Sequence, residues 1–195
     1  WTGETVRRSH PVVAELMTRG AGFTHADRMA LFDLYGWVLR DIVPRYARLA
    51  GTGRIEISTT PHDHPLAPLL IDFAAARDAR PDAPLPVARA YPGGEDRVRA
   101  HVEAAFASHA RRFDAPPAGV WPAEGAVSDA VLRVLREAGS KWAASGEGVL
   151  VNTLRRAGLP AERRSDYLYR PYRFGDAGPL CFFRDDRLSD LIGFE

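Results

Sequence analysis

Carboxylates follow several predicted strands of this chain, and their types are suited to acid–base chemistry. A short apolar run ends on Trp121 and is followed by Glu124, while Asp185 and Asp186 follow a later apolar run. Two carboxylates that face one cleft can act as nucleophile and general acid, which is the arrangement that cleaves glycosidic bonds. An indole beside a carboxylate also suits stacking on a sugar ring. The alternative role for each carboxylate is at a helix N-terminus, where it offsets the helix dipole.

Histidines form a second candidate set, in the segment Thr-Thr-Pro-His-Asp-His-Pro at 59–65. Imidazoles such as His62 and His64 can bind zinc, so a metal-dependent hydrolase or a polysaccharide deacetylase is an alternative function. No histidine follows His109 in the sequence, so carboxylates alone would have to complete such a site, and we expect no metal. His64 alternatively contacts a substrate hydroxyl or a backbone group.

Strand and helix patterns alternate from residue 51 onward. Strands are predicted at 54–60, 119–121, 141–145 and 180–184, helices at 65–80, 96–113, 126–139 and 148–157, and loops at 81–94 and 158–179. The strands are continuous apolar runs, which favours parallel pairing in an α/β fold. Because the carboxyl ends of parallel strands share one edge, we expect His64, Glu124, Glu147 and Asp185 near one another.

Residues 1–50 are predicted to be helical. Thr24 is a candidate N-cap for a helix from Asp27 to Val43, and Pro44 is expected at the junction with the next turn. The chain begins on Trp1 rather than on a methionine and stops at 193–195, in the middle of a patterned segment. We therefore expect residues 1–195 to be part of a catalytic domain that lacks flanking segments of its own.

Composition narrows the function classes. The 26 basic residues are balanced by 25 acidic ones and are scattered among them, so we expect no nucleic-acid partner. No apolar stretch approaches the roughly 20 residues that span a bilayer, so we expect no membrane partner. The single cysteine, Cys181, excludes an intrachain disulfide and favours a reducing cytoplasm.

Three segments, Ile55–Leu70, Gly119–Ser128 and Phe182–Phe194, resemble motif segments of glycoside hydrolase family 57 in the same order. This is the α-amylase and α-glucanotransferase family. Its first motif, a strand that ends in His-Gln-Pro, is absent here. The resemblance implies the central, incomplete part of a distorted parallel (β/α)7 barrel and a retaining mechanism on α-glucans or maltooligosaccharides.

The resemblance also implies roles for individual residues. Glu124 would be the nucleophile and Asp185 the general acid and base, with Asp186 as the alternative within the doublet. Trp121, His64, Glu147 and Asp186 would bind substrate, and no metal or cofactor is required. Because the first motif is missing, a non-catalytic carbohydrate-binding fragment remains an alternative.

Overall fold

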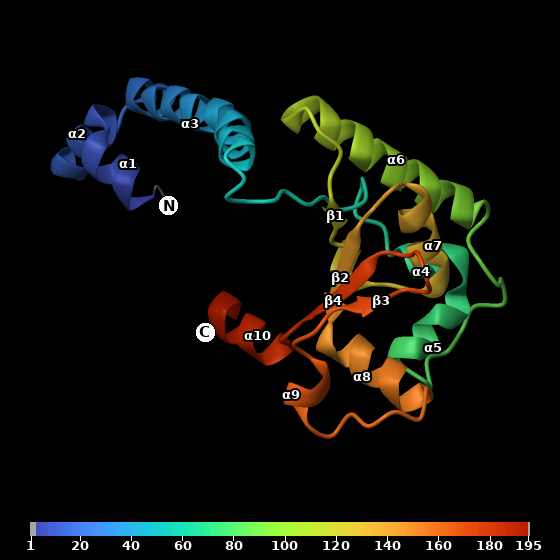
Figure 1. The fold of residues 1–195 in the computed structure, drawn as a ribbon. Helices are drawn as coiled ribbons and strands as arrows, with labels where there is room; N and C mark the ends of the chain where they lie inside the picture. The colour runs from blue at the N-terminus through green and yellow to red at the C-terminus, as the bar shows by residue number, and fades with distance from the viewer. Residues whose placement is uncertain (1–2, 195) are drawn as a thin grey trace. The chain divides into compact units, whose positions relative to one another are not determined.

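The computed structural model describes residues 3–194 of the chain. The backbone divides into two compact units, Trp1–Arg54 and Ile55–Glu195. Figure 1 shows the helices of the first unit in blue and the sheet of the second in yellow to red. Among the helices described between residues 3 and 194, none is long and apolar enough to cross a membrane.

The first unit is helical. It contains α1 (Glu4–Ser9), α2 (Pro11–Arg19) and α3 (His25–Gly51). Thr24 caps α3 as predicted: its hydroxyl accepts a hydrogen bond from the Asp27 N–H at 3.2 Å, and the Asp27 carboxylate accepts one from the Thr24 N–H at 2.7 Å. The predicted junction at Pro44 is wrong, because α3 continues through it. Arg40, whose carbonyl the proline leaves without a donor, is exposed, so water can hydrate that carbonyl.

The second unit is built on a four-stranded sheet in the order β1-β2-β4-β3. The strands are β1 (Gly119–Val120), β2 (Trp142–Gly146), β3 (Tyr172–Arg173) and β4 (Leu180–Arg184). β1, β2 and β4 are parallel, with Trp142 opposite both Gly119 and Leu180. β3 pairs antiparallel with β4, so this α/β sheet is mixed rather than wholly parallel as expected.

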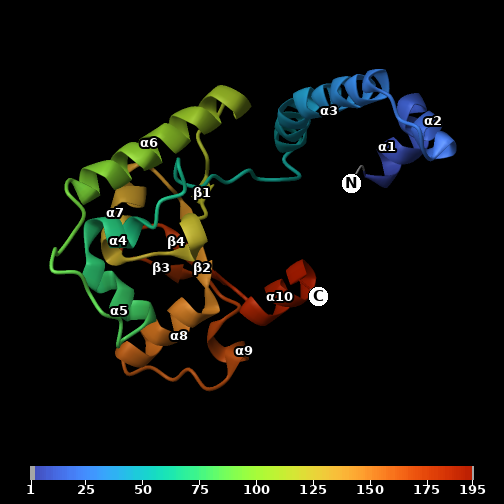
Figure 2. The same cartoon turned by 180° about the vertical axis from the view of Figure 1, so that it is seen from behind.

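Two hydrophobic clusters join helices of the second unit to this sheet. The helices of the unit are α4 (Ala67–Ile71), α5 (Ala76–Ala79), α6 (Gly94–Phe113), α7 (Asp129–Glu137), α8 (Glu147–Arg156), α9 (Arg164–Tyr167) and α10 (Asp186–Phe194). The larger cluster joins α4, α6 and α7 to the sheet through fully buried residues such as Val98, Val120 and Leu135, and Figures 1 and 2 show these three helices on one side of the strands. In the smaller cluster, Leu150 and Leu154 of α8 pack on Tyr167 of α9.

Three predicted elements differ from the structure. The segment 54–60 is not a strand and forms a single parallel bridge between Thr59 and Val120, because β1 offers only two residues for pairing. The predicted helix 65–80 breaks at Asp72, whose extended backbone and carboxylate cap a new turn at Phe73–Ala75. The segment 158–179, predicted as a loop, contains α9 and β3.

Candidate active site

The carboxyl ends of the parallel strands carry most of the residues singled out from the sequence. Thr59 extends the sheet beside β1, since its N–H donates to the Gly119 carbonyl at 3.1 Å and its carbonyl accepts from the Trp121 N–H at 2.8 Å. His64 follows this bridge, Glu124 follows β1, and Glu147 and Asp185 follow β2 and β4 directly. The parallel register therefore brings the ends of β1, β2 and β4 and the Thr59 bridge to one edge, although the first of the four predicted strands is only this bridge.

Glu124 lies in a tight turn, Ala123–Gly125, which begins three residues after the end of β1. Its backbone is left-handed, with φ 55° and ψ 19°, which is uncommon for a residue other than glycine. One carboxylate oxygen lies 2.9 Å from Nε2 of His64, and the Glu124 side chain is 73% exposed. The turn is tied to β2, because the buried Ser145 hydroxyl donates to the Gly125 carbonyl at 2.6 Å. The structure thus joins His64 and Glu124, which lie 60 residues apart in the sequence.

Trp121 and Asp186 both contact the side chain of Arg184 at the same edge of the sheet. The Arg184 guanidinium lies 5.8 Å from the centre of the Trp121 ring system, within cation–π range. Arg184 also donates to Oδ1 of Asp186 at 2.9 Å, and Oδ2 of Asp186 accepts from the Gly148 N–H at 3.3 Å. Asp186 therefore contacts the first turn of α8, where a carboxylate is favoured by the helix dipole.

Asp185 lies among hydrogen-bond donors. Its carboxylate accepts from the Leu188 N–H at 2.8 Å and from the Tyr169 hydroxyl at 2.7 Å, and it pairs with Arg164 at 2.6 Å. These donors, the Leu188 amide foremost, lower the pKa of Asp185 to about 2. The side chain is only 13% exposed. In this arrangement Asp185 is an anion, whereas a general acid must hold a proton near its working pH.

Glu147 is held by the same arginine. Arg164 donates to the two Glu147 carboxylate oxygens at 2.6 and 2.5 Å, and the Tyr167 hydroxyl donates to one of them at 3.3 Å. Burial, and the charge of Glu147 next, raise the pKa of Tyr167. Arg164 thus bridges Glu147 and Asp185. Sequence patterns did not predict this bridge, because Arg164 lies in a segment that was assigned to a loop.

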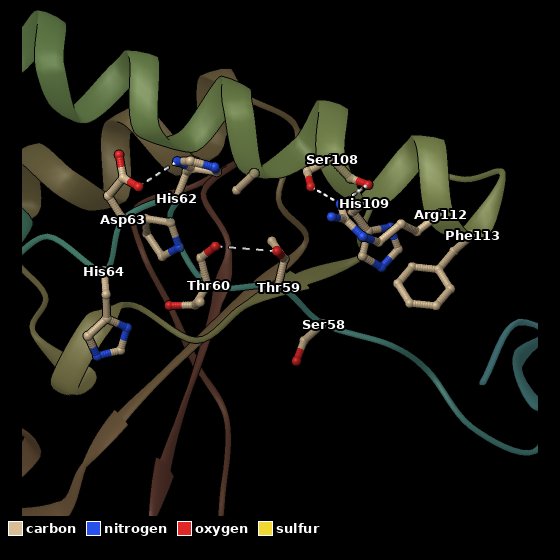
Figure 3. Close-up of a pocket in the computed structure, with 12 residues that line it drawn as sticks. Ser58, Thr59, Thr60, His62, Asp63, His64, Ser108, His109, Arg112 and Phe113 are labelled. Carbon is tan, nitrogen blue, oxygen red and sulfur yellow. Dashed lines mark hydrogen bonds and ion pairs between the residues drawn. The ribbon is translucent and has the colours of Figure 1, made fainter. Parts of the chain in front are cut away.

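The structure separates the two histidines of the alternative, metal-dependent interpretation. His62 directs Nδ1 toward Asp63 at 3.0 Å, while His64 contacts Glu124. Figure 3 shows the two imidazoles on different sides of the segment. His62 instead lies with Asp63 and His101 of α6, and the ligand atoms of these three residues fall within 4.8 Å of one another. A site built on His62 and His64 together is therefore not what this geometry favours.

A cavity of about 380 Å³ lies between this segment and α6 (Figure 3). Glu124 and Asp185 are not among the residues that line it, so it is distinct from the strand-end carboxylates. Its wall includes His109, a buried residue whose Nδ1 lies 2.8 Å from the Ala115 carbonyl and whose Nε2 lies 3.2 Å from the Ile57 carbonyl. His109 therefore fixes the path of the chain that leads into the Thr59 bridge.

Comparisons with known proteins identify the family to which this chain belongs. Similar solved structures are a novel alpha-amylase from Thermotoga maritima (15% identity, TM-score 0.59, 97% of this chain and 30% of that one) and a GH57-type branching enzyme from Pyrococcus horikoshii (14%, 0.55, 99% and 32%). A 4-alpha-glucanotransferase from Thermococcus litoralis is similar as well (18%, 0.54, 83% and 22%). The chain thus spans about a third or less of these structures, and no curated protein matches it. The model of glycosyl hydrolase family 57 matches residues 1–195, so the chain belongs to that family.

Proposed function

We propose that the protein is a retaining glycoside hydrolase or transglycosylase that acts on α-glucans, with Glu124 as its nucleophile. Membership of family 57 and the likeness to an amylase, a glucanotransferase and a branching enzyme support the substrate class. The assignment of Glu124 as the nucleophile rests on the position of its carboxylate. Its carboxylate is exposed at the carboxyl edge of the parallel strands and is oriented by His64.

In the first step, the Glu124 carboxylate attacks the anomeric carbon while an acid protonates the departing glycosidic oxygen, which gives a glycosyl ester on Glu124. Water or a sugar hydroxyl then attacks the same carbon and releases Glu124, and the acid residue takes up the proton of the incoming group. We assign to Asp185 both the role of acid in the first step and the role of base in the second. The two carboxyl groups are then expected about 5–5.5 Å apart in the substrate complex.

Asp185 requires a change of partners for this role. Its pKa of about 2 follows from its contacts with Leu188, Tyr169 and Arg164, so proton donation requires that substrate displace at least one of these donors. Trp121 would stack on a sugar ring, and His64 would orient Glu124 and contact a sugar hydroxyl. Asp186 and Glu147 would order the rim of the site through Arg184 and Arg164.

We further propose that β1, β2 and β4 are consecutive parallel strands of a (β/α)7 barrel within one catalytic domain. The parallel register of these strands supports this proposal. Segments outside residues 1–195 would supply the remaining strands and the rest of the substrate cleft.

Incubation with maltooligosaccharides, followed by chromatography of the products, tests the proposal. Glu124→Gln should abolish product formation, because the amide cannot form the glycosyl ester. Glu103→Gln makes the same change at an exposed position of α6 and should leave products unchanged. Wild-type products that persist in Glu124→Gln would exclude Glu124 as nucleophile, and product lengths would separate hydrolysis from transfer.

A further inference from the structure

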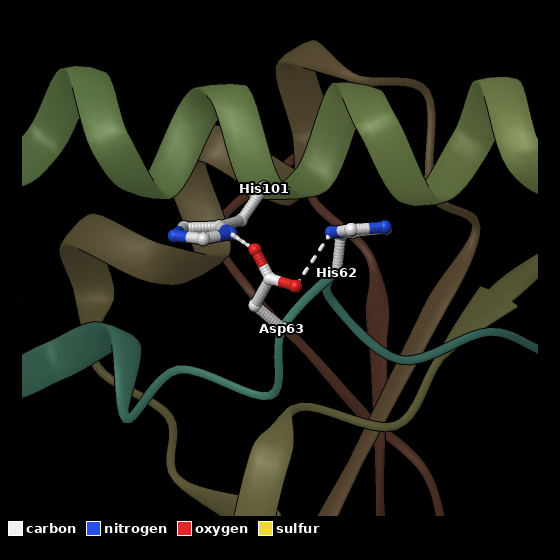
Figure 4. Close-up of side chains that lie close together, drawn as sticks. All are labelled: His62, Asp63 and His101. Carbon is white, nitrogen blue, oxygen red and sulfur yellow. Dashed lines mark ion pairs between the residues drawn. The ribbon is translucent and has the colours of Figure 1, made fainter.

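We infer that His62, Asp63 and His101 form a binding site for a divalent metal ion of the zinc class. Figure 4 shows the Asp63 carboxylate between the two imidazoles, with each ring presenting Nδ1 to a different oxygen. Histidine nitrogen and carboxylate oxygen are preferred zinc ligands, and three protein ligands with one open position are a common set. This site lies outside the proposed chemistry, since none of the three residues is assigned a role in it.

The distances are close to those that a tetrahedral ion requires. Zinc lies about 2.0–2.2 Å from nitrogen and oxygen ligands, so neighbouring ligand atoms of a tetrahedron lie about 3.3 Å apart. The observed separations from Asp63 bracket this value: Oδ1 lies 3.0 Å from Nδ1 of His62, and Oδ2 lies 3.7 Å from Nδ1 of His101. All three ligand atoms already lie within 4.8 Å of one another, so binding requires only that the three side chains rotate closer together.

The separation of 3.7 Å also shows what the ion would add. It is too long for a hydrogen bond, so His101 and Asp63 are close without a direct bond between them. A metal ion that accepts one lone pair from each ring and one from the carboxylate would join all three groups. Their exposure also permits entry from solvent, because the side chains of His62, Asp63 and His101 are 53%, 68% and 26% exposed.

The backbone holds the ligands in place before any ion binds. The His62 N–H donates to the carbonyl of His101 at 3.0 Å, which fixes the segment against α6. Asp63 and His64 both have left-handed backbones, with φ of 59° and 54°. This turn directs Asp63 toward α6 and the next side chain, His64, toward Glu124. A metal bound at Asp63 would therefore fix the loop that positions His64.

Zinc titration of metal-free protein by calorimetry tests the site, with Zn²⁺ alone as the probe. We expect one ion per chain. Loss of an outer contact at a zinc site typically costs about 10–100-fold in affinity, so loss of a ligand in Asp63→Asn or His101→Gln should cost at least about tenfold. His25→Gln, at an exposed position of α3, is the matched control and should bind as the wild type does. Circular dichroism establishes that each variant is folded.

His64→Gln distinguishes this ligand set from the neighbouring histidine pair. We expect it to retain zinc affinity, whereas an affinity that depends on His64 and not on His101 would overturn the proposal. Absence of zinc binding by the wild type at millimolar Zn²⁺ would overturn it as well. The visible absorption of bound Co²⁺ provides a readout independent of calorimetry and of activity. It should appear in the wild type and in His64→Gln and be lost in His101→Gln.

Discussion

Replacing Glu124 by glycine should make the protein more stable than replacing it by alanine, although both variants lose the proposed nucleophile. Glu124 has φ 55°, and a left-handed backbone costs a residue with a Cβ about 1–2 kcal/mol relative to glycine. Glycine loses about 0.5–1 kcal/mol more backbone entropy on folding than alanine does. The difference leaves Glu124→Gly ahead of Glu124→Ala by roughly 0.5–1 kcal/mol in the free energy of unfolding.

The same pair of substitutions at Glu103 is the control. Glu103 is exposed within α6, where glycine is about 0.8–1.0 kcal/mol less favourable than alanine. Both positions lie in the unit Ile55–Glu195, so urea denaturation monitors the same part of the chain for all four variants. The order of glycine and alanine should reverse between the two positions. If glycine is the less stable variant at both, the left-handed backbone of Glu124 stores no strain and the reasoning fails.

Other expectations concern the supports of the site. Ser145→Ala should lower the free energy of unfolding by about 1–3 kcal/mol, because the buried Gly125 carbonyl loses its donor; an unchanged urea midpoint would contradict this. Leu135→Ala should cost about 2–5 kcal/mol in the same assay, since Leu135 is fully buried between α7 and the sheet. Asp185 has a folded pKa of about 2, below its unfolded value of about 3.9, so its stabilising contribution is complete above about pH 5 and is lost progressively as the pH falls through 4 toward 2. NMR titration of its carboxyl should show that midpoint, and a midpoint near 4 would contradict it. Arg164→Met should raise the midpoint, and an unchanged value would show that Arg164 does not affect the ionisation of Asp185.

The positions of the strand ends were predictable because they depend on local pattern and topology. Apolar runs followed by polar residues predict where each parallel strand stops, and parallel pairing then brings the stops together. Strand lengths were less predictable. The alternating pattern of 54–60 is typical of a strand, yet only Thr59 pairs, because β1 offers just two residues as partners.

The partners of the site residues were not predictable from the sequence. Asp63 and His101 lie 38 positions apart, and their proximity depends on where α6 packs rather than on either local pattern. Arg164 lies 17 residues after Glu147 in a segment without clear periodicity, and only the placement of α9 brings it to the carboxylates. The sequence pattern predicts which residues reach the edge of the sheet, whereas packing determines which of them form ion pairs there.

The bridge made by Arg164 bears directly on the proposed mechanism. Release of Asp185 would be costly if it left a guanidinium without a counterion in a partly buried site. Arg164 avoids this cost because it contacts the two carboxylates through two nitrogens. Its Nη2 contacts both Asp185 and Glu147, whereas its Nε donates to Glu147 alone, at 2.6 Å. When substrate displaces Nη2 from Asp185, the ion pair with Glu147 can persist. In the proposed mechanism, Glu147 would keep Arg164 paired while the pKa of Asp185 rises.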